Sequence, residues 1–259
     1  MKKYLVVLSL FCLSFGNLSA QETNKWQESR STHFIVYYKS ASPDFIQKVI
    51  DKSESFYNNI AESLGYNRYN FWLWDNRAKI YIHDNLNGYR SATGQPGWSA
   101  GISNPEQKII NSFPYAQGFF EHLLPHEIGH IIFREFIGLY NNAVPVWLDE
   151  GVASYQESLT DSRMKLIVNN AFSQNKLIAL KQLFGMNPYL MRDTNTIGLF
   201  YAQSASLIEY LVKEFSRDRF VIFCQDLRDK KDFQKAMSSN YPFSNIQELE
   251  EGWKKYLKK

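Results

Sequence analysis

Apolar and polar residues alternate in two early stretches of the chain, as expected for strands with one buried face. Residues 32–39 and 78–83 predict two such strands, and residues 97–102 and 107–113 predict a hairpin that turns at 103–106. The polar residues 86–96 between them predict a loop. This pattern indicates a small sheet in the N-terminal part of the chain.

The stretch between the first two strands has helical spacing instead. Ser42 is a typical N-cap, Pro43 suits the first helical position, and apolar residues follow three and four apart until Gly65. We therefore expect an amphipathic helix on one face of the sheet. Trp72 and Trp74, at strand spacing, are interpreted as core residues rather than as a ligand platform.

The second half of the chain is predicted to be helical. Residues 118–136 predict one helix, which begins or bends near Pro125 because proline donates no backbone hydrogen bond. Residues 144–155 predict another, with Pro145 at its start. The overall expectation is an α+β fold with three parts after the leader: an N-terminal α/β part with the sheet (21–117), two central helices (118–158) and a helical C-terminal subdomain (159–259).

The C-terminal subdomain ends in an amphipathic segment. Its apolar residues lie on one stripe, and Ser244 with Gln247 predicts a capping box at its start. The four lysines close to the end of the chain are interpreted as favourable charges at a helix C-terminus rather than as a docking patch.

The first twenty residues have a composition of their own. Two lysines precede an apolar run that reaches Phe15, and small residues follow up to Ala20. This is the layout of a secretory signal peptide, so residues 1–20 predict export to the periplasm or beyond. The run is shorter than the ~20 residues that span a bilayer, so no stable membrane anchor is expected after cleavage.

Composition and net charge limit the number of domains and the kinds of partner that we expect. Of the 259 residues, 44% are hydrophobic and 16% aromatic, which fits one globular unit or two closely packed subdomains. Without Lys2 and Lys3 the net charge falls from +3 to +1, so no nucleic-acid partner is expected. Cys224 is the one cysteine that remains after removal of residues 1–20. Its apolar neighbours predict a buried thiol. The oligomeric state is left open.

The most informative residues for chemistry are His126, Glu127 and His130. Histidines four residues apart lie on one face of a helix, where both rings can bind one metal ion, and Glu127 lies beside them to activate water. His122 is a rival ligand, but it would be about 12 Å from His130 along the helix at 1.5 Å per residue. We interpret it as a residue of the rim.

Two further segments complete this picture. Gly151 and Ala153 keep the second central helix slim, so that it can bring Glu150 to the open side of the histidine pair, with Asp149 as a group that orients a histidine. The predicted hairpin would present an edge strand that can hold an extended peptide, or it is a plain surface hairpin. The substrate-binding residues predicted on it are Trp98, Ser99, Ala100 and Gly101. The two remaining histidines of the mature chain, His33 and His83, are expected to be a strand and a turn residue.

The sequence His-Glu-x-x-His, followed after nineteen residues by the glutamate of Trp-Leu-Asp-Glu-Gly-x-Ala, resembles the gluzincin metallopeptidases and, within them, the Peptidase MA-like proteins. The resemblance covers most of the mature chain, including residues 200–211 and 249–257. It implies that Zn²⁺ is held by His126, His130 and Glu150, and that Glu127 is the general base and proton shuttle. It also suggests Tyr201 as a donor to the oxyanion of the reaction.

The resulting hypothesis is an exported zinc metallopeptidase that hydrolyses peptide bonds in a peptide or protein substrate. A zinc amidase that acts on cell-wall material would use the same residues. A catalytically silent member of the fold, kept as a binding or assembly module, belongs to a different class, but it would not need the complete set of ligands and base. Whether substrates are cut internally or from an end is left open.

Overall fold

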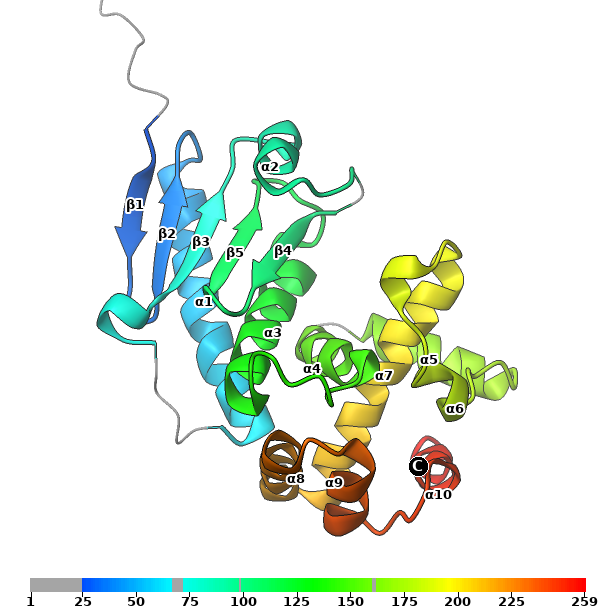
Figure 1. The fold of residues 1–259 in the computed structure, drawn as a ribbon. Helices are drawn as coiled ribbons and strands as arrows, with labels where there is room; N and C mark the ends of the chain where they lie inside the picture. Colours follow the sequence, from blue (N-terminus) through cyan, green and yellow to red (C-terminus); the bar gives the residue numbers. More distant parts are fainter. Residues whose placement is uncertain (1–24, 67–71, 98, 160–161) are drawn as a thin grey trace, which may run out of the picture.

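Five strands form one mixed sheet in the order β1-β2-β3-β5-β4 (Figure 1). The structure is a computed structural model that describes residues 25–66, 72–97, 99–159 and 162–259. The predicted signal peptide and Trp98 lie outside these residues. The pairs β2·β3 and β3·β5 are parallel, whereas β1·β2 and β4·β5 are antiparallel. The strands are β1 (Gln27–Arg30), β2 (Phe34–Tyr38), β3 (Ala78–Ile82), β4 (Gly101–Asn104) and β5 (Ile109–Ser112).

The predicted hairpin is confirmed, and β4 is an edge strand of the sheet. In Figure 1, β4 is the strand on the side of the sheet that faces the helical half of the molecule. The predicted strands at 32–39 and 78–83 are confirmed as β2 and β3. The short strand β1 was not predicted because its sequence, Gln-Glu-Ser-Arg, has no apolar alternation.

The predicted amphipathic helix is α1 (Pro43–Leu64), and its caps are those that the sequence indicates. The Ser42 hydroxyl accepts a hydrogen bond from the Phe45 amide, and Gly65 adopts a left-handed φ of 78° at the end. Such a φ strains residues with a Cβ, so glycine is the natural C-cap. The buried residues of α1 pack on the sheet and on α3 (Leu124–Ile137).

Residues 86–96 are not a loop throughout, as the sequence suggested. They contain α2 (Leu86–Thr93), in which the Asn85 side chain accepts from the Gly88 amide and Gly94 ends the helix with a φ of 69°. The helix has a single buried residue, Tyr89, so the apolar periodicity that identifies helices is absent. The two caps, Asn85 and Gly94, were the only local signals of a helix in this stretch.

The two tryptophans before β3 differ in burial. Trp72 is 1% exposed and its indole nitrogen donates to Glu135 at 2.6 Å, which confirms its assignment to the core. Trp74 is 79% exposed in the short turn η1 (Trp74–Asn76), so its assignment to the core was wrong. His83 is not a plain turn residue either, because its buried ring bonds to Asn111 on β5 at 3.0 Å.

The rest of the described chain is helical, and the long helix α7 runs through this half (Figure 1). None of the helices in the described ranges is long and apolar enough to cross a membrane. Besides α3, the elements are the π-helical turn η2 (Phe119–Leu123), α4 (Val146–Ser158), α5 (Arg163–Ser173), α6 (Leu180–Leu183), η3 (Pro188–Leu190), α7 (Thr194–Phe215), α8 (Arg217–Lys230), α9 (Phe233–Asn240) and α10 (Ile246–Tyr256).

The capping of α10 differs from the prediction by one residue. Asn245, not Ser244, is the N-cap, and its side chain accepts from the Glu248 amide at 3.0 Å. The Glu248 carboxylate accepts in return from the Ser244 amide at 2.7 Å. The box is therefore built from Asn245 and Glu248, which bond the amides of Glu248 and Ser244, whereas the predicted pair would have bonded those of Gln247 and Ser244.

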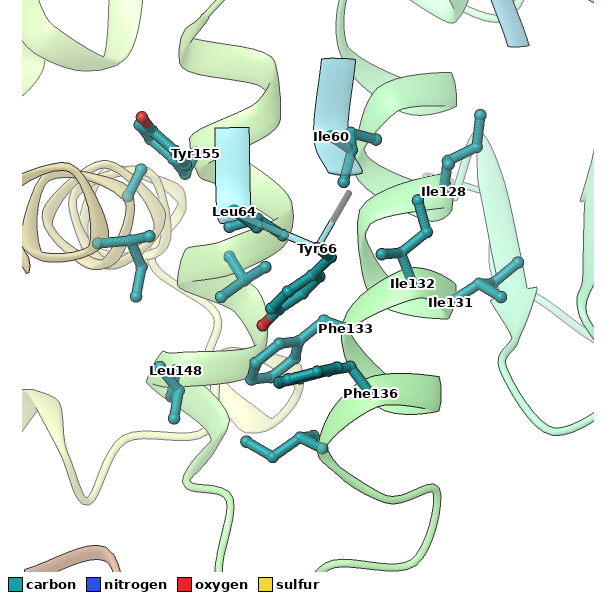
Figure 2. Packing of buried hydrophobic residues seen from close by; sticks show 14 of the residues in the cluster. Ile60, Leu64, Tyr66, Ile128, Ile131, Ile132, Phe133, Phe136, Leu148 and Tyr155 are labelled. Atoms are coloured by element: carbon teal, nitrogen blue, oxygen red, sulfur yellow. The ribbon is translucent and has the colours of Figure 1, made fainter. Parts of the chain in front are cut away.

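One apolar core joins the sheet half to the helical half. Figure 2 shows side chains of α1, α3 and α4 meeting in one cluster, with Tyr66 among them. Cys224 on α8 belongs to the same core, as predicted, and burial raises the pKa of its thiol to about 12. Helix α3 is thus fixed on several sides, which holds the residues on its remaining face in place.

Candidate metal centre and substrate groove

Helix α3 carries the two histidines at its first turns. It begins at Leu124, with Pro125 in the first turn, directly after the π-helical turn η2, so the expected start near Pro125 is confirmed. The Nε2 atoms of His126 and His130 lie 3.0 Å apart. Both rings point to one side of the helix, as the spacing of four residues predicts.

Helix α4 approaches α3 closely because small residues face it. A Cβ on Gly129 of α3 would lie 3.2 Å from the Cα of Ala153 on α4, so these backbones are nearly in contact. On its other side, α4 meets α7, where a Cβ on Gly151 would lie 2.8 Å from the Ser204 carbonyl oxygen. The slim helix predicted from Gly151 and Ala153 is confirmed.

This packing brings the Glu150 carboxylate to the two histidines. Its Oε2 atom lies 3.5 Å from Nε2 of His126 and 3.6 Å from Nε2 of His130. These three residues form a group that could hold a metal ion. Glu150 is buried, and its Oε2 has no hydrogen-bond partner in the part of the chain that the structure describes.

Carboxylates hold the far nitrogen of each ring. Nδ1 of His126 lies 2.6 Å from Glu157 Oε1, and Nδ1 of His130 lies 3.1 Å from Asp149 Oδ1. A carboxylate accepts, so each Nδ1 carries the proton that it donates. The Asp149 carboxylate is itself fixed by Arg134 at 2.7 Å. The orienting role that the sequence suggested for Asp149 is therefore consistent with its position.

The donor set fits a zinc ion. When each ring carries a single proton, on Nδ1, both Nε2 atoms present lone pairs to each other and to the buried Glu150 Oε2. Three acceptors then converge, and only a cation, either a further proton or a metal ion, relieves their repulsion. Ligands at about 2.0 to 2.1 Å in tetrahedral geometry lie about 3.3 Å from one another. The observed separations of 3.0, 3.5 and 3.6 Å bracket that value.

The pKa shifts within the cluster also favour a bound cation. Burial disfavours the charged imidazole of His126, but the carboxylates of Glu150 and Glu157 outweigh it and raise its pKa to about 10. The pKa of His130 is also raised, because Glu150 and Asp149 outweigh its burial. The pKa of the Glu150 carboxyl is lowered, since the two histidines overcome the effect of burial. Such a site favours positive charge, whether a proton or a metal ion supplies it.

Two tyrosines lie beside the cluster. Tyr201 on α7, predicted from the sequence, has its ring centroid 6.3 Å from that of His126. Burial and the carboxylates of Glu150 and Glu157 raise the pKa of its hydroxyl, which therefore stays protonated and can donate. Tyr189 was not predicted. It stands in the turn η3, and its hydroxyl donates to Glu150 Oε1 at 2.5 Å.

A groove of about 700 Å³ runs over the cluster, between β4 and the helices. Glu127 lines it together with the three metal-binding candidates and both tyrosines. Of the residues predicted to bind substrate, Ser99, Ala100 and Gly101 line the opposite wall, whereas Trp98 lies outside the described residues. The structure thus brings every described residue of the predicted site to one groove.

Local contacts position β4 at this wall. The Ser99 hydroxyl bonds to the Tyr89 hydroxyl at 2.7 Å and donates to the Gly101 carbonyl at 3.1 Å. A Cβ on Gly101 would lie 2.8 Å from the Leu123 side chain, so glycine lets the strand approach the turn η2, which leads directly into α3. The short helix α2, absent from the sequence prediction, therefore supports this wall of the groove through Tyr89.

The other histidines are not in the ligand group. His122 lines the rim of the groove, with its Nδ1 3.4 Å from Glu157 Oε2, as its assignment to the rim requires. His33 pairs with Glu54 on α1 at 2.6 Å. Sequence reasoning missed Glu157 and Tyr189, because each reaches the site through tertiary packing and neither lies within a spacing motif.

Comparison with known proteins agrees with this geometry. No curated protein matches the chain. The model of one family, the Peptidase MA superfamily, matches residues 75–259, a region that contains the three candidate ligands, Glu127 and both tyrosines. Since this match covers well over half of the sequence, the chain belongs to the Peptidase MA superfamily, a family of metallopeptidase-like proteins.

Proposed function

We propose that the protein is an exported, zinc-dependent peptidase of the gluzincin type, which hydrolyses peptide bonds in a peptide or protein substrate. One observation carries the proposal: the two Nε2 atoms and the unpartnered Glu150 Oε2 converge at zinc-like separations on the floor of a groove. Two imidazoles and one carboxylate are a ligand set of catalytic zinc sites, which keep a fourth position for water.

A zinc ion bound by His126, His130 and Glu150 would polarise the scissile carbonyl and lower the pKa of water. Side chains of this protein transfer the protons and stabilise the developing charge. Glu127, next to His126 and lining the groove, takes the proton from water and passes it to the leaving amine. The protonated hydroxyl of Tyr201 donates to the oxygen on which negative charge develops.

Substrate would lie along β4. The strand is at the edge of the sheet and its residues line the groove, so its backbone can pair with an extended peptide. Extended binding fits a polypeptide substrate and supports peptide-bond hydrolysis over hydrolysis of a compact ligand.

Export is the part of the proposal that rests on sequence alone. Its support is the layout of residues 1–20, with two lysines, an apolar run and a small-residue end. Expression of the full chain in a bacterial host, followed by fractionation and N-terminal sequencing, tests it. Loss of the first twenty residues in the exported fraction is expected, and an intact cytoplasmic chain contradicts export.

Glu127→Gln tests the reaction. The change keeps the shape of the side chain and removes the base, so zinc should stay bound while cleavage of a mixed peptide library falls by at least about 10²-fold. Retained peptide cleavage in this variant would refute the assignment of the base. If the wild type binds zinc but cleaves no peptide, a screen of cell-wall fragments decides between an amidase and a silent binding module.

A further inference from the structure

The sheet has one face that the helices of the described chain leave open. Successive strand residues point to opposite faces of a sheet. Val36 and Ile80 belong to the core that the sheet shares with α1 and α3, whereas Tyr37 and Tyr81 lie on the other face and are half-buried. Figure 1 shows α1 and α3 on one side of the sheet and α2 at the end of the strands. A ligand can therefore reach the open face.

One row of side chains crosses this face. The register aligns Tyr37 on β2 with Tyr81 on β3. It also aligns Tyr81 with Asn111 on β5, and Asn111 with Ile102 on β4. Four neighbouring strands span about 14 Å at a strand spacing of about 4.8 Å. The rings of Tyr37 and Tyr81 stack with centroids 4.8 Å apart, and Trp26 meets Tyr81 edge-on at 5.3 Å. One half of the row is thus aromatic.

A groove of about 310 Å³ lies along the other half of the row. Strands β3, β4 and β5 form its floor, and Ala92 and Thr93 of α2 form a wall. Its volume is at the lower end of the range of ligand sites, about 300 to 1,000 Å³. Among the described residues that line it, none is acidic, basic or a histidine. A charged ligand would lose water here without gaining a partner, so the groove favours an uncharged one.

The polar groups of the groove are amides and hydroxyls. Both kinds of group donate as well as accept hydrogen bonds, so the ligand groups that match them best are neutral groups that also do both, above all hydroxyls. The three amides and three hydroxyls belong to Asn104, Gln107, Asn111, Thr93, Ser103 and Tyr81.

Two of the amides are held in place before any ligand binds. Oδ1 of Asn111 lies 3.0 Å from Nε2 of His83, and Oδ1 of Asn104 accepts from the Gln107 backbone amide at 3.1 Å. In each case the side-chain nitrogen is still a donor. Side chains that are already ordered lose little entropy on binding, which favours a specific site over a merely polar surface.

An oligosaccharide has the two features that this face can bind. Its hydroxyls donate and accept, and the C–H face of a sugar ring is apolar enough to pack on the aromatic rings that continue the row beyond the groove. A peptide is a poorer match, because the backbone groups of the inner strands are already paired within the sheet and only the edges can accept another strand.

We propose that the open face of the sheet, at Tyr81 and the amide-lined groove beside it, is a binding site for a neutral oligosaccharide. Ile102 and Ser103 line this groove and the substrate groove, so the sugar would lie next to the strand along which substrate is proposed to bind. The inference goes beyond the proposed peptidase function and does not depend on it, since neither the candidate metal ligands nor Glu127 line this groove.

Calorimetry on the purified protein tests the proposal with four neutral tetrasaccharides, built from glucose, N-acetylglucosamine, mannose or xylose. At least one should bind with a Kd of about 1 mM or below. Its Kd should be the same with zinc and with a chelator, and the same at low and high salt, because the lining carries no charge. In nuclear magnetic resonance spectra, the side-chain amide signals of Asn104, Gln107 and Asn111 should shift on binding.

Two pairs of variants locate the site. Tyr81→Leu removes the ring and should weaken binding by about 2- to 10-fold, the worth of an aromatic contact, whereas Tyr81→Phe should bind nearly as the wild type does. Ala92→Leu narrows the groove from its α2 wall and should also weaken binding. Ser91→Leu places the same side chain on the exposed surface of α2, outside the lining, and should change nothing. Thermal midpoints show which variants are folded.

Binding of none of the four sugars, or an unchanged Kd in a folded Tyr81→Leu or Ala92→Leu variant, would overturn the site. Binding that is lost with the chelator or at high salt would also overturn it, because the sugar would then lie at the metal centre or depend on charge. None of these results bears on the peptidase proposal, which Glu127→Gln tests separately.

Discussion

Nδ1 of His126 lies 2.6 Å from the Glu157 carboxylate, which stands two helical turns beyond the candidate ligand Glu150 on the same helix. Helix α4 therefore supplies a candidate metal ligand and, from the same face two turns later, the carboxylate that orients another candidate ligand. Each ring of the histidine pair has such a partner, since Asp149 on α4 holds His130. The position of one helix thus sets the geometry of the whole centre.

Glu157→Ala should weaken zinc binding. Without its carboxylate the His126 ring loses the partner that fixes its tautomer and orientation, and changes of this kind cost about 10- to 100-fold in metal affinity. Competition with a chromophoric chelator measures the effect. Glu157→Gln keeps an acceptor oxygen and should lose less, so equal affinities of wild type and Glu157→Ala would show that this hydrogen bond does not matter.

Tyr189→Phe and Tyr201→Phe should differ in effect. Tyr189 donates to Glu150 Oε1 and so holds the carboxylate with Oε2 toward the histidines, which means that its loss should reduce zinc affinity. Tyr201 makes no such bond in the described part of the chain, so its loss should lower kcat and leave zinc affinity unchanged. Chelator competition and steady-state kinetics on both variants separate the roles. A fall in zinc affinity for Tyr201→Phe alone would reverse the assignment.

Zinc uptake should release protons. The pKa of His126 is raised to about 10 in the cluster without metal, so at pH 7 its Nε2 holds a proton that zinc must displace. Apparent affinity should then rise with pH up to about 10 and fall as the solution becomes more acidic. Calorimetry in buffers of different ionisation enthalpy counts the protons. No release at pH 7 would mean that the cluster is already deprotonated before zinc binds.

Gly151→Ala should disturb both stability and the metal centre. The added Cβ would lie 2.8 Å from a backbone oxygen of α7, and relief requires α4 to shift, with a cost of about 1–3 kcal/mol. Because Glu150 precedes this residue on α4, zinc affinity should fall together with the thermal midpoint. Gly198→Ala on α7 is the matched control, since its Cβ meets open space and should leave stability unchanged or raised by about 1 kcal/mol. Equal stability of both variants would contradict the tight contact between α4 and α7.

The three candidate ligands could be predicted because each of them is marked by local sequence. His126 and His130 are one turn apart, and Gly151 and Ala153 beside Glu150 mark a helix that packs closely, as the structure confirms. The hairpin that contains β4 was also predicted, from two short segments on either side of a turn at 103–106. Glu157, Tyr189 and helix α2 were missed for a shared reason: their roles come from contacts between segments far apart in the chain, or from a helix with one buried residue.

Zinc content of the purified protein tests the central claim most directly. Elemental analysis after exposure to zinc and desalting should give about one zinc per chain in the wild type and in Glu127→Gln. Glu150→Ala should retain much less, because it removes the third ligand. Absence of zinc in the wild type, or equal content in wild type and Glu150→Ala, would contradict a centre built from His126, His130 and Glu150.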